Sequence, residues 1–96
     1  MSSLPHLLTP YTEDIAYAAG ARPATSSVEF IAQLGRASYN LGQVAGIAGA
    51  DSLDTAATLI AEAGDDSHND HTALLTRATR HLKRLPDMVA EYRELV

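Results

Sequence analysis

The stretch that decides the fold is Leu75–Val96, which reads LTRATRHLKRLPDMVAEYRELV. Apolar side chains recur along it at alternating spacings of three and four residues, without a slip. These positions are Leu75, Ala78, Leu82, Leu85, Val89, Tyr92 and Val96. That period places them along one side of an α-helix, where they can pack against neighbouring helices. The stretch therefore predicts an all-α protein whose helices pack along heptad-like seams.

Pro86 interrupts the backbone of this helical pattern. Proline cannot donate a hydrogen bond to the carbonyl group of Leu82, and it disfavours helical geometry at Leu85. The apolar period nevertheless continues across it. We therefore expect either one helix kinked at Pro86 or two nearly collinear helices, with Pro86 at the first position of the second.

The motif Ser26-Ser27-Val28-Glu29 is a capping-box pattern and predicts the start of the first long helix, with Ser26 as its N-cap. We expect this helix to reach about Gly49, where a turn follows. Its expected seam consists of Ile31, Leu34, Ser38, Leu41, Ala45 and Ala48. Three glycines within it, Gly35, Gly42 and Gly46, are interpreted as points where a neighbouring helix approaches closely, because glycine otherwise weakens a helix.

Two shorter helices are expected on either side of the first long helix. The first runs from about Tyr11 to Ala19 and is closed by Gly20, a residue suited to a helix C-terminus. The second starts after Asp51, which is a favourable N-cap, and runs to Ala63. Its expected seam is Leu53, Ala56, Ile60 and Ala63.

These elements predict a small antiparallel helical bundle with three long helical elements, the last kinked at Pro86, plus a short N-terminal helix. The connections near Gly49 and Gly64 are short, which favours antiparallel neighbours. We expect a single domain over residues 11–96, preceded by an irregular arm over residues 1–10. No stretch shows the strict alternation of apolar and polar residues that is typical of β-strands.

The composition limits the classes of function. A chain of 96 residues is sized for one domain, and its formal net charge of −5 disfavours general binding to nucleic acid. It holds no cysteine, so it offers no disulfide and no thiolate for catalysis or metal binding. Its longest uncharged run, Ala37–Ala50, is too short to span a membrane. We expect a cytoplasmic protein without a membrane segment.

The primary functional hypothesis is a non-enzymatic protein–protein contact, in a regulatory or accessory protein that forms homodimers. The middle helix is too short to cover both longer neighbours, and alanine-rich contacts bury little apolar area. We therefore expect an exposed apolar patch around Leu85, Val89 and Tyr92, where a protein partner or a second copy docks.

A basic stripe provides a second functional hypothesis. Arg77, Arg80, Lys83 and Arg84 lie on the side of the last helix opposite its seam. Residues 1–70 carry a net charge of −7, whereas residues 71–96 carry +2. Such a stripe can contact an acidic protein surface, or phosphates in a nucleic-acid-associated regulator, although no aromatic residue within it can stack on a base.

A third hypothesis places a metal-dependent enzyme or sensor around residues 62–71. Asp65, His68 and His71 are spaced three apart and would share one face of a helix, as ligands of zinc could. Gly64 and the polar residues around them favour a solvated loop instead. We therefore predict no bound metal and no cofactor.

Two acidic pairs, Asp51-x-x-Asp54 and Glu62-x-x-Asp65, superficially resemble the paired motifs of all-α nucleotide pyrophosphohydrolases, which hold magnesium between helices. The separation of the pairs is shorter than in that family. A magnesium site needs carboxylates that face inward, whereas Asp51 and Asp65 fall at predicted helix ends. Capping and solvation explain these residues better, and we predict no enzymatic activity.

Overall fold

The computed structural model describes residues 4–44, 47, 49–64 and 71–95. In chain order its elements are the 3₁₀ turn η1 (Thr9–Tyr11) and the α-helices α1 (Thr12–Ala19), α2 (Ser27–Gln43), α3 (Ser52–Ala63), α4 (His71–Leu82) and α5 (Leu85–Leu95). No strand occurs in this described part of the chain, so the predicted small all-α bundle is confirmed. None of these helices is both long and apolar enough to cross a membrane.

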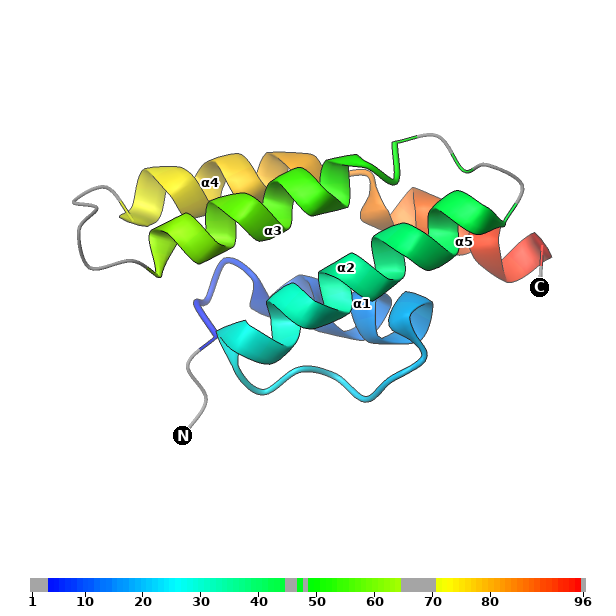
Figure 1. Ribbon diagram of the computed structural model, residues 1–96, viewed down its shortest axis with the longest axis horizontal. Coiled ribbons are helices and arrows are strands. Elements are labelled where there is room, and N and C mark those ends of the chain that lie inside the picture. Colours follow the sequence, from blue (N-terminus) through cyan, green and yellow to red (C-terminus); the bar gives the residue numbers. More distant parts are fainter. Residues whose placement is uncertain (1–3, 45–46, 48, 65–70, 96) are drawn as a thin grey trace.

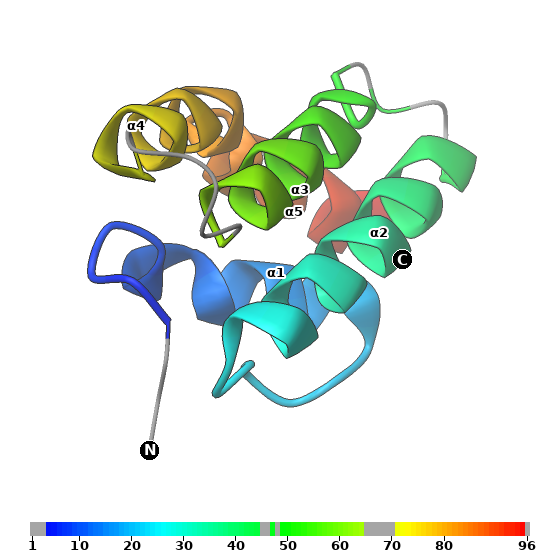
Figure 2. The same ribbon diagram turned by 60° about the vertical axis from the view of Figure 1, so that its left-hand side comes forward.

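The helices form two layers (Figure 1). In one layer α3 and α4 run antiparallel, and α3 is also antiparallel to α2, as the short connections predicted. The segment 20–26 runs back along α1 before α2 begins, so α1 and α2 point in the same general direction (Figures 1 and 2). Helix α5 packs against α1 and α2 and closes the core between the layers.

The core draws on every helix and on the segment before η1. Its largest fully buried side chains are Phe30, Leu8, Ile15, Leu34, Leu41, Leu53, Leu82, Leu85 and Val89. The predicted seam of α3 is confirmed, since all four of its residues are buried. In α2 the buried face is rotated slightly from the prediction. Phe30 and Ala37 are fully buried, whereas Ile31 is only half-buried.

Local capping interactions determine where α1 ends and where α2 begins. The Ser26 hydroxyl accepts a 3.3 Å hydrogen bond from the backbone N–H of Glu29, which confirms the predicted N-cap. The Glu29 carboxylate accepts a bond from the N–H of Thr25, one residue earlier than a standard capping box. Gly20 has a φ of +69°, and the N–H of Ala21 donates to Ala16, which together form a Schellman motif that ends α1.

Helix α2 is shorter than predicted, because it ends at Gln43 rather than near Gly49. Val44 has extended geometry, with φ −87° and ψ 107°. The chain then turns so that Ile47 and Ala50 enter the core, where each is 4% exposed. The burial of these two side chains accompanies the end of the helix, in a segment whose glycines already weaken it. The expected seam positions Ala45 and Ala48, and Gly46, lie outside the described residues.

The C-terminal segment forms two helices rather than one kinked helix, which was one of the two predicted outcomes. Helix α4 ends at Leu82, and α5 begins at Leu85 with Pro86 at its second position instead of its first. A proline there loses no intrahelical hydrogen bond. The Met88 N–H donates to the carbonyl oxygen of Arg84 at 3.0 Å and closes the first turn of α5. The break lets α4 pack on α3 while α5 packs on α1.

The N-terminal segment is more ordered than the predicted arm. Leu8 is fully buried in the core, and η1 leads directly into α1. The Leu8 N–H donates to the carbonyl oxygen of Pro5 at 2.9 Å. Residues 4–10 therefore belong to the folded unit, and the expected boundary between residues 10 and 11 does not separate two parts of the structure.

Candidate functional site

The apolar patch expected at the C-terminal end is covered within the chain. Leu85 is 0% exposed and Val89 is 2% exposed, so the prediction that they form an open docking patch is wrong. Because the chain breaks before Leu85, α5 turns its seam onto α1 and α2. Tyr92 is partly buried, and its ring meets the ring of Tyr17 edge-on at a centroid distance of 6.1 Å.

The basic stripe, in contrast, lies on the surface. Arg77, Arg80, Lys83 and Arg84 are all exposed. In the described part of the chain none of the four forms an ion pair, and Lys83 does not pair with Asp87 one helical turn on. We call these four residues the basic face. It contains uncompensated positive charge on a chain whose formal net charge is −5.

The four residues of the basic face differ in whether their side chains contact the rest of the fold. The Arg84 guanidinium lies against the turn before α3, where its Nη1 would stand 3.5 Å from a Cβ built on Gly49. Arg77, Arg80 and Lys83 extend from α4 and its C-terminal turn into solvent. A partner would therefore contact three cationic side chains that extend into solvent and one, Arg84, that packs against the fold.

Only part of the expected metal site can be placed. Asp65 and His68 lie outside the described residues. His71 begins α4, and its Nδ1 contacts the carbonyl oxygen of Ala63 at the end of α3. This contact links the ends of two helices. Among the residues that the structure describes, no group of three His, Cys, Asp or Glu side chains is placed to hold a metal ion.

The carboxylates at the start of α3 are not buried between helices. Asp51 and Asp54 are both exposed. Asp51 lies at the N-cap position of α3, as predicted, but its side chain makes no capping hydrogen bond. Glu62 is also exposed, at the other end of the helix. Asp51 and Asp54 instead line a groove between α2 and α3. The magnesium arrangement considered from the sequence therefore has no inward-facing carboxylates in the described chain.

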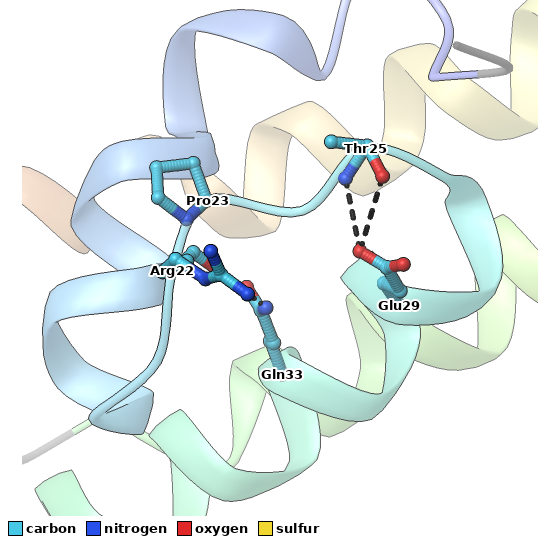
Figure 3. A pocket seen from close by; sticks show the side chains of 5 residues that line it. All are labelled: Arg22, Pro23, Thr25, Glu29 and Gln33. Carbon is cyan, nitrogen blue, oxygen red and sulfur yellow. Dashed lines mark hydrogen bonds between the residues drawn. The ribbon is translucent and has the colours of Figure 1, made fainter. Parts of the chain in front are cut away.

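A cavity of about 570 Å³ lies between the segment 20–26 and α2 (Figure 3), lined by Arg22, Pro23, Thr25, Glu29 and Gln33. Its polar groups mostly serve the fold. Glu29 is bound to Thr25, and the Gln33 Nε2 donates to the carbonyl oxygen of Arg22 at 2.8 Å. The Gln33 Oε1 is buried without a hydrogen-bond partner. The lining includes no residue that combines with a second one as a nucleophile and its base.

The groove that Asp51 and Asp54 line is about 470 Å³ in volume and extends from α3 over the outer side of α2. Its lining comprises Gly35, Ser38, Tyr39, Gly42, Gln43, Asp51 and Asp54. Ser38 is buried and donates to the carbonyl oxygen of Ala50 at 2.9 Å, so it is a packing residue, as predicted. Tyr39 is 68% exposed at the edge of the groove.

The sequence reasoning missed the outer face of α2. Val28 and Tyr39 are the two most exposed large hydrophobic residues of the described chain, at 78% and 68%. The signal was present, since Val28, Ala32, Gly35, Tyr39 and Gly42 repeat at spacings of four and three. Helix α2 carries two apolar series that both fit a helical period, and the prediction placed only one of them on a contact surface, the core. The explanation of its glycines by a close helix is wrong for Gly35, whose surroundings are open.

Comparisons with protein families, with curated proteins and with solved structures found no match for this chain. Its function is therefore inferred from its own residues.

Proposed function

We propose that this protein is a non-enzymatic, regulatory or accessory protein that binds an acidic surface of a partner protein through its basic face. The observation that supports the proposal is the set of exposed cations on α4 and the turn that follows it, Arg77, Arg80 and Lys83, none of which has an ion-pair partner in the described chain. Exposed, unpaired charges of one sign promote encounter with a surface of the opposite sign and fix its orientation.

A protein partner is favoured over nucleic acid by two further features. The whole chain carries a formal net charge of −5. A polyanion that extends past the basic face is therefore repelled by the rest of the protein. Helix α4 also holds no Phe, Tyr or Trp that could stack on a base. A local acidic patch on a protein can meet the basic face without experiencing the rest of the charge distribution at close range.

Catalysis is not part of the proposal. Of the residues considered for a metal site, His71 contacts the carbonyl oxygen of Ala63, and Asp51, Asp54 and Glu62 are exposed rather than turned inward. The lack of cysteine also leads us to propose the cytoplasm as the compartment, since small secreted domains usually rely on disulfides.

The experiment that tests this function is affinity capture from the native cell followed by mass spectrometry and cross-link mapping. The variant Arg77→Glu/Arg80→Glu/Lys83→Glu should lose the captured protein, whereas the charge-conserving Arg77→Lys/Arg80→Lys should retain it. Binding of the purified pair should weaken as salt is raised.

Two results would contradict the proposal. One is a partner whose cross-links avoid α4 and whose binding survives the triple charge reversal. The other is tight, salt-dependent binding of duplex DNA that the triple variant abolishes, which would favour the nucleic-acid hypothesis.

A further inference from the structure

Helix α2 is apolar on two opposite sides. Phe30, Leu34, Ala37 and Leu41 are fully buried and form its inner side. A second, uncharged series is exposed on the outer side, and we call it the outer stripe: Val28, Ala32, Gly35, Tyr39 and Gly42. A helix whose interior contacts use only one side needs no such stripe for its own fold. An exposed apolar series of this kind marks a contact surface.

The glycines of the outer stripe leave room for another helix. A Cβ built on Gly35 would meet nothing within 4 Å, and one on Gly42 would meet only the Ala50 Cβ at 4.0 Å. Both glycines line the groove of about 470 Å³. Glycine costs helix stability relative to alanine. Its presence twice in the stripe, seven residues or about two turns apart, suits close approach of a second backbone.

Opposite charges lie on the two flanks of the outer stripe. Asp51 and Asp54 line the groove on the α3 side, where Ser38 bonds to Ala50. Arg36 is the one basic residue of α2 and is exposed. Successive helical residues turn by about 100°, so Arg36 projects on the flank away from Ser38. In the described chain neither Arg36 nor the two aspartates form an ion pair.

We propose that the outer stripes of two copies pack as a parallel pair around a two-fold axis that runs along α2. This symmetry brings the Arg36 flank of each copy against the α3 flank of the other. Each Arg36 then enters the other copy's groove and meets Asp54 and Asp51. An antiparallel pair would instead place Arg36 against Arg36. Charge complementarity therefore selects both the occupant, a second copy, and its direction.

The size of the surface sets the strength of this dimer. Helix α2 has 17 residues and is therefore about 25 Å long. One helical face of that length, with the groove beside it, falls below the roughly 1,200 Å² of total buried area that typifies stable complexes. We accordingly infer a reversible dimer that assembles at about 0.1 mM and above. It leaves the basic face of α4 open, so it does not depend on the proposed function.

The test is sedimentation equilibrium between about 10 µM and 1 mM, a range that brackets the inferred affinity. The wild type should shift from monomer to dimer. Arg36→Glu and Asp54→Lys should each weaken association by at least about tenfold. An equal mixture of the two variants should form a heterodimer, because both charge pairs are then opposite in sign. Arg77→Glu is the matched control and should dimerise like the wild type.

The direction is tested in this cysteine-free chain with Tyr39→Cys. A parallel pair brings the two introduced thiols together, so oxidation should give a cross-linked dimer of Tyr39→Cys alone. Far-UV circular dichroism checks that every variant is folded.

Three results would overturn the inference. The first is a wild type that stays monomeric at 1 mM. The second is a dimer that is lost in Arg77→Glu but kept in Arg36→Glu. The third is cross-linking that requires Ala32→Cys mixed with Tyr39→Cys, which would indicate an antiparallel pair.

Discussion

The hydroxyl of Ser38 donates a 2.9 Å hydrogen bond to the carbonyl oxygen of Ala50, and both residues are buried. This bond connects the middle of α2 with the residue where the chain turns into α3. The Ala50 carbonyl oxygen also accepts a 3.0 Å bond from the backbone N–H of Leu53, so the Ser38 hydroxyl is its second donor. The position of α3 against α2, and with it the wall of the outer groove, depends on this contact.

Ser38→Ala should therefore lower the free energy of unfolding by about 0.5–1.5 kcal/mol, because the buried Ala50 carbonyl loses one of its two donors and keeps only the backbone N–H of Leu53. Urea denaturation measures the change. Thr58→Ala is the matched control: its hydroxyl also donates to a backbone carbonyl, that of Asp54, but on the exposed side of α3. It should change stability by less than about 0.5 kcal/mol. Equal effects of the two substitutions would contradict a special role for the buried bond.

Leu82 tests the seam that predicted the fold. It is fully buried at the end of α4, and Leu82→Ala should cost about 2–5 kcal/mol through lost burial and a new cavity. Leu95 is the comparison, since it is 48% exposed at the end of α5. Leu95→Ala should cost less than about 1 kcal/mol. Denaturant midpoints measure both, and a loss at Leu82 no larger than that at Leu95 would mean that the burial is misassigned.

The seam shows how far the sequence alone could reach. Four of its positions, Ala78, Leu82, Leu85 and Val89, are buried as the period predicted. The period survives the break between the helices because Leu82 and Leu85 keep a spacing of three. The direction of α5 after the break could not be predicted, because two turn residues can aim a helix at several neighbours. The expected docking patch failed for that reason.

The end of α2 shows the opposite limit. The segment after Gln43 continues the apolar period of α2, and its three alanines favour helix, although Gly46 and Gly49 weaken it. The helix stops because Ile47 and Ala50 gain burial in the core. Such a gain depends on α3 and α5, which local patterns do not represent. Asp51 and Asp54 follow this segment and line one groove with Tyr39, a juxtaposition that local sequence patterns could not predict.

Two glycines should respond to alanine in opposite ways. Gly20 has a φ of +69°, where a Cβ is strained, so Gly20→Ala should destabilise the protein by about 1–2 kcal/mol. Gly35 lies within α2 in open surroundings, so Gly35→Ala should stabilise the monomer by up to about 1 kcal/mol. Thermal unfolding at low micromolar concentration, where self-association is absent, compares them. A shift of the same sign in both variants would contradict the backbone geometry described.

The last prediction concerns the aromatic and cation–π contacts between α1 and α5. The Arg93 guanidinium carbon lies 4.4 Å from the ring centroid of Tyr17, and the Tyr92 ring meets the same ring at an interplanar angle of 85°. Tyr17 is 43% exposed, so water competes for this cation–π contact. Arg93→Ala should therefore cost only about 0.5–1 kcal/mol. The substitution Tyr17→Leu keeps most of the apolar contact with α5 but removes the aromatic face.

A double-mutant cycle of Arg93→Ala and Tyr17→Leu, followed by urea denaturation, isolates the pairwise term. We expect a coupling free energy of about 0.5 kcal/mol or more, since each single substitution already removes the same contact. Arg77→Ala combined with Tyr17→Leu is the control, because Arg77 lies on α4 and makes no contact with that ring in the described chain. Additive effects in both cycles would mean that Arg93 and Tyr17 are neighbours without a stabilising interaction, and that the buried residues Leu85, Met88 and Val89 hold α5 in place.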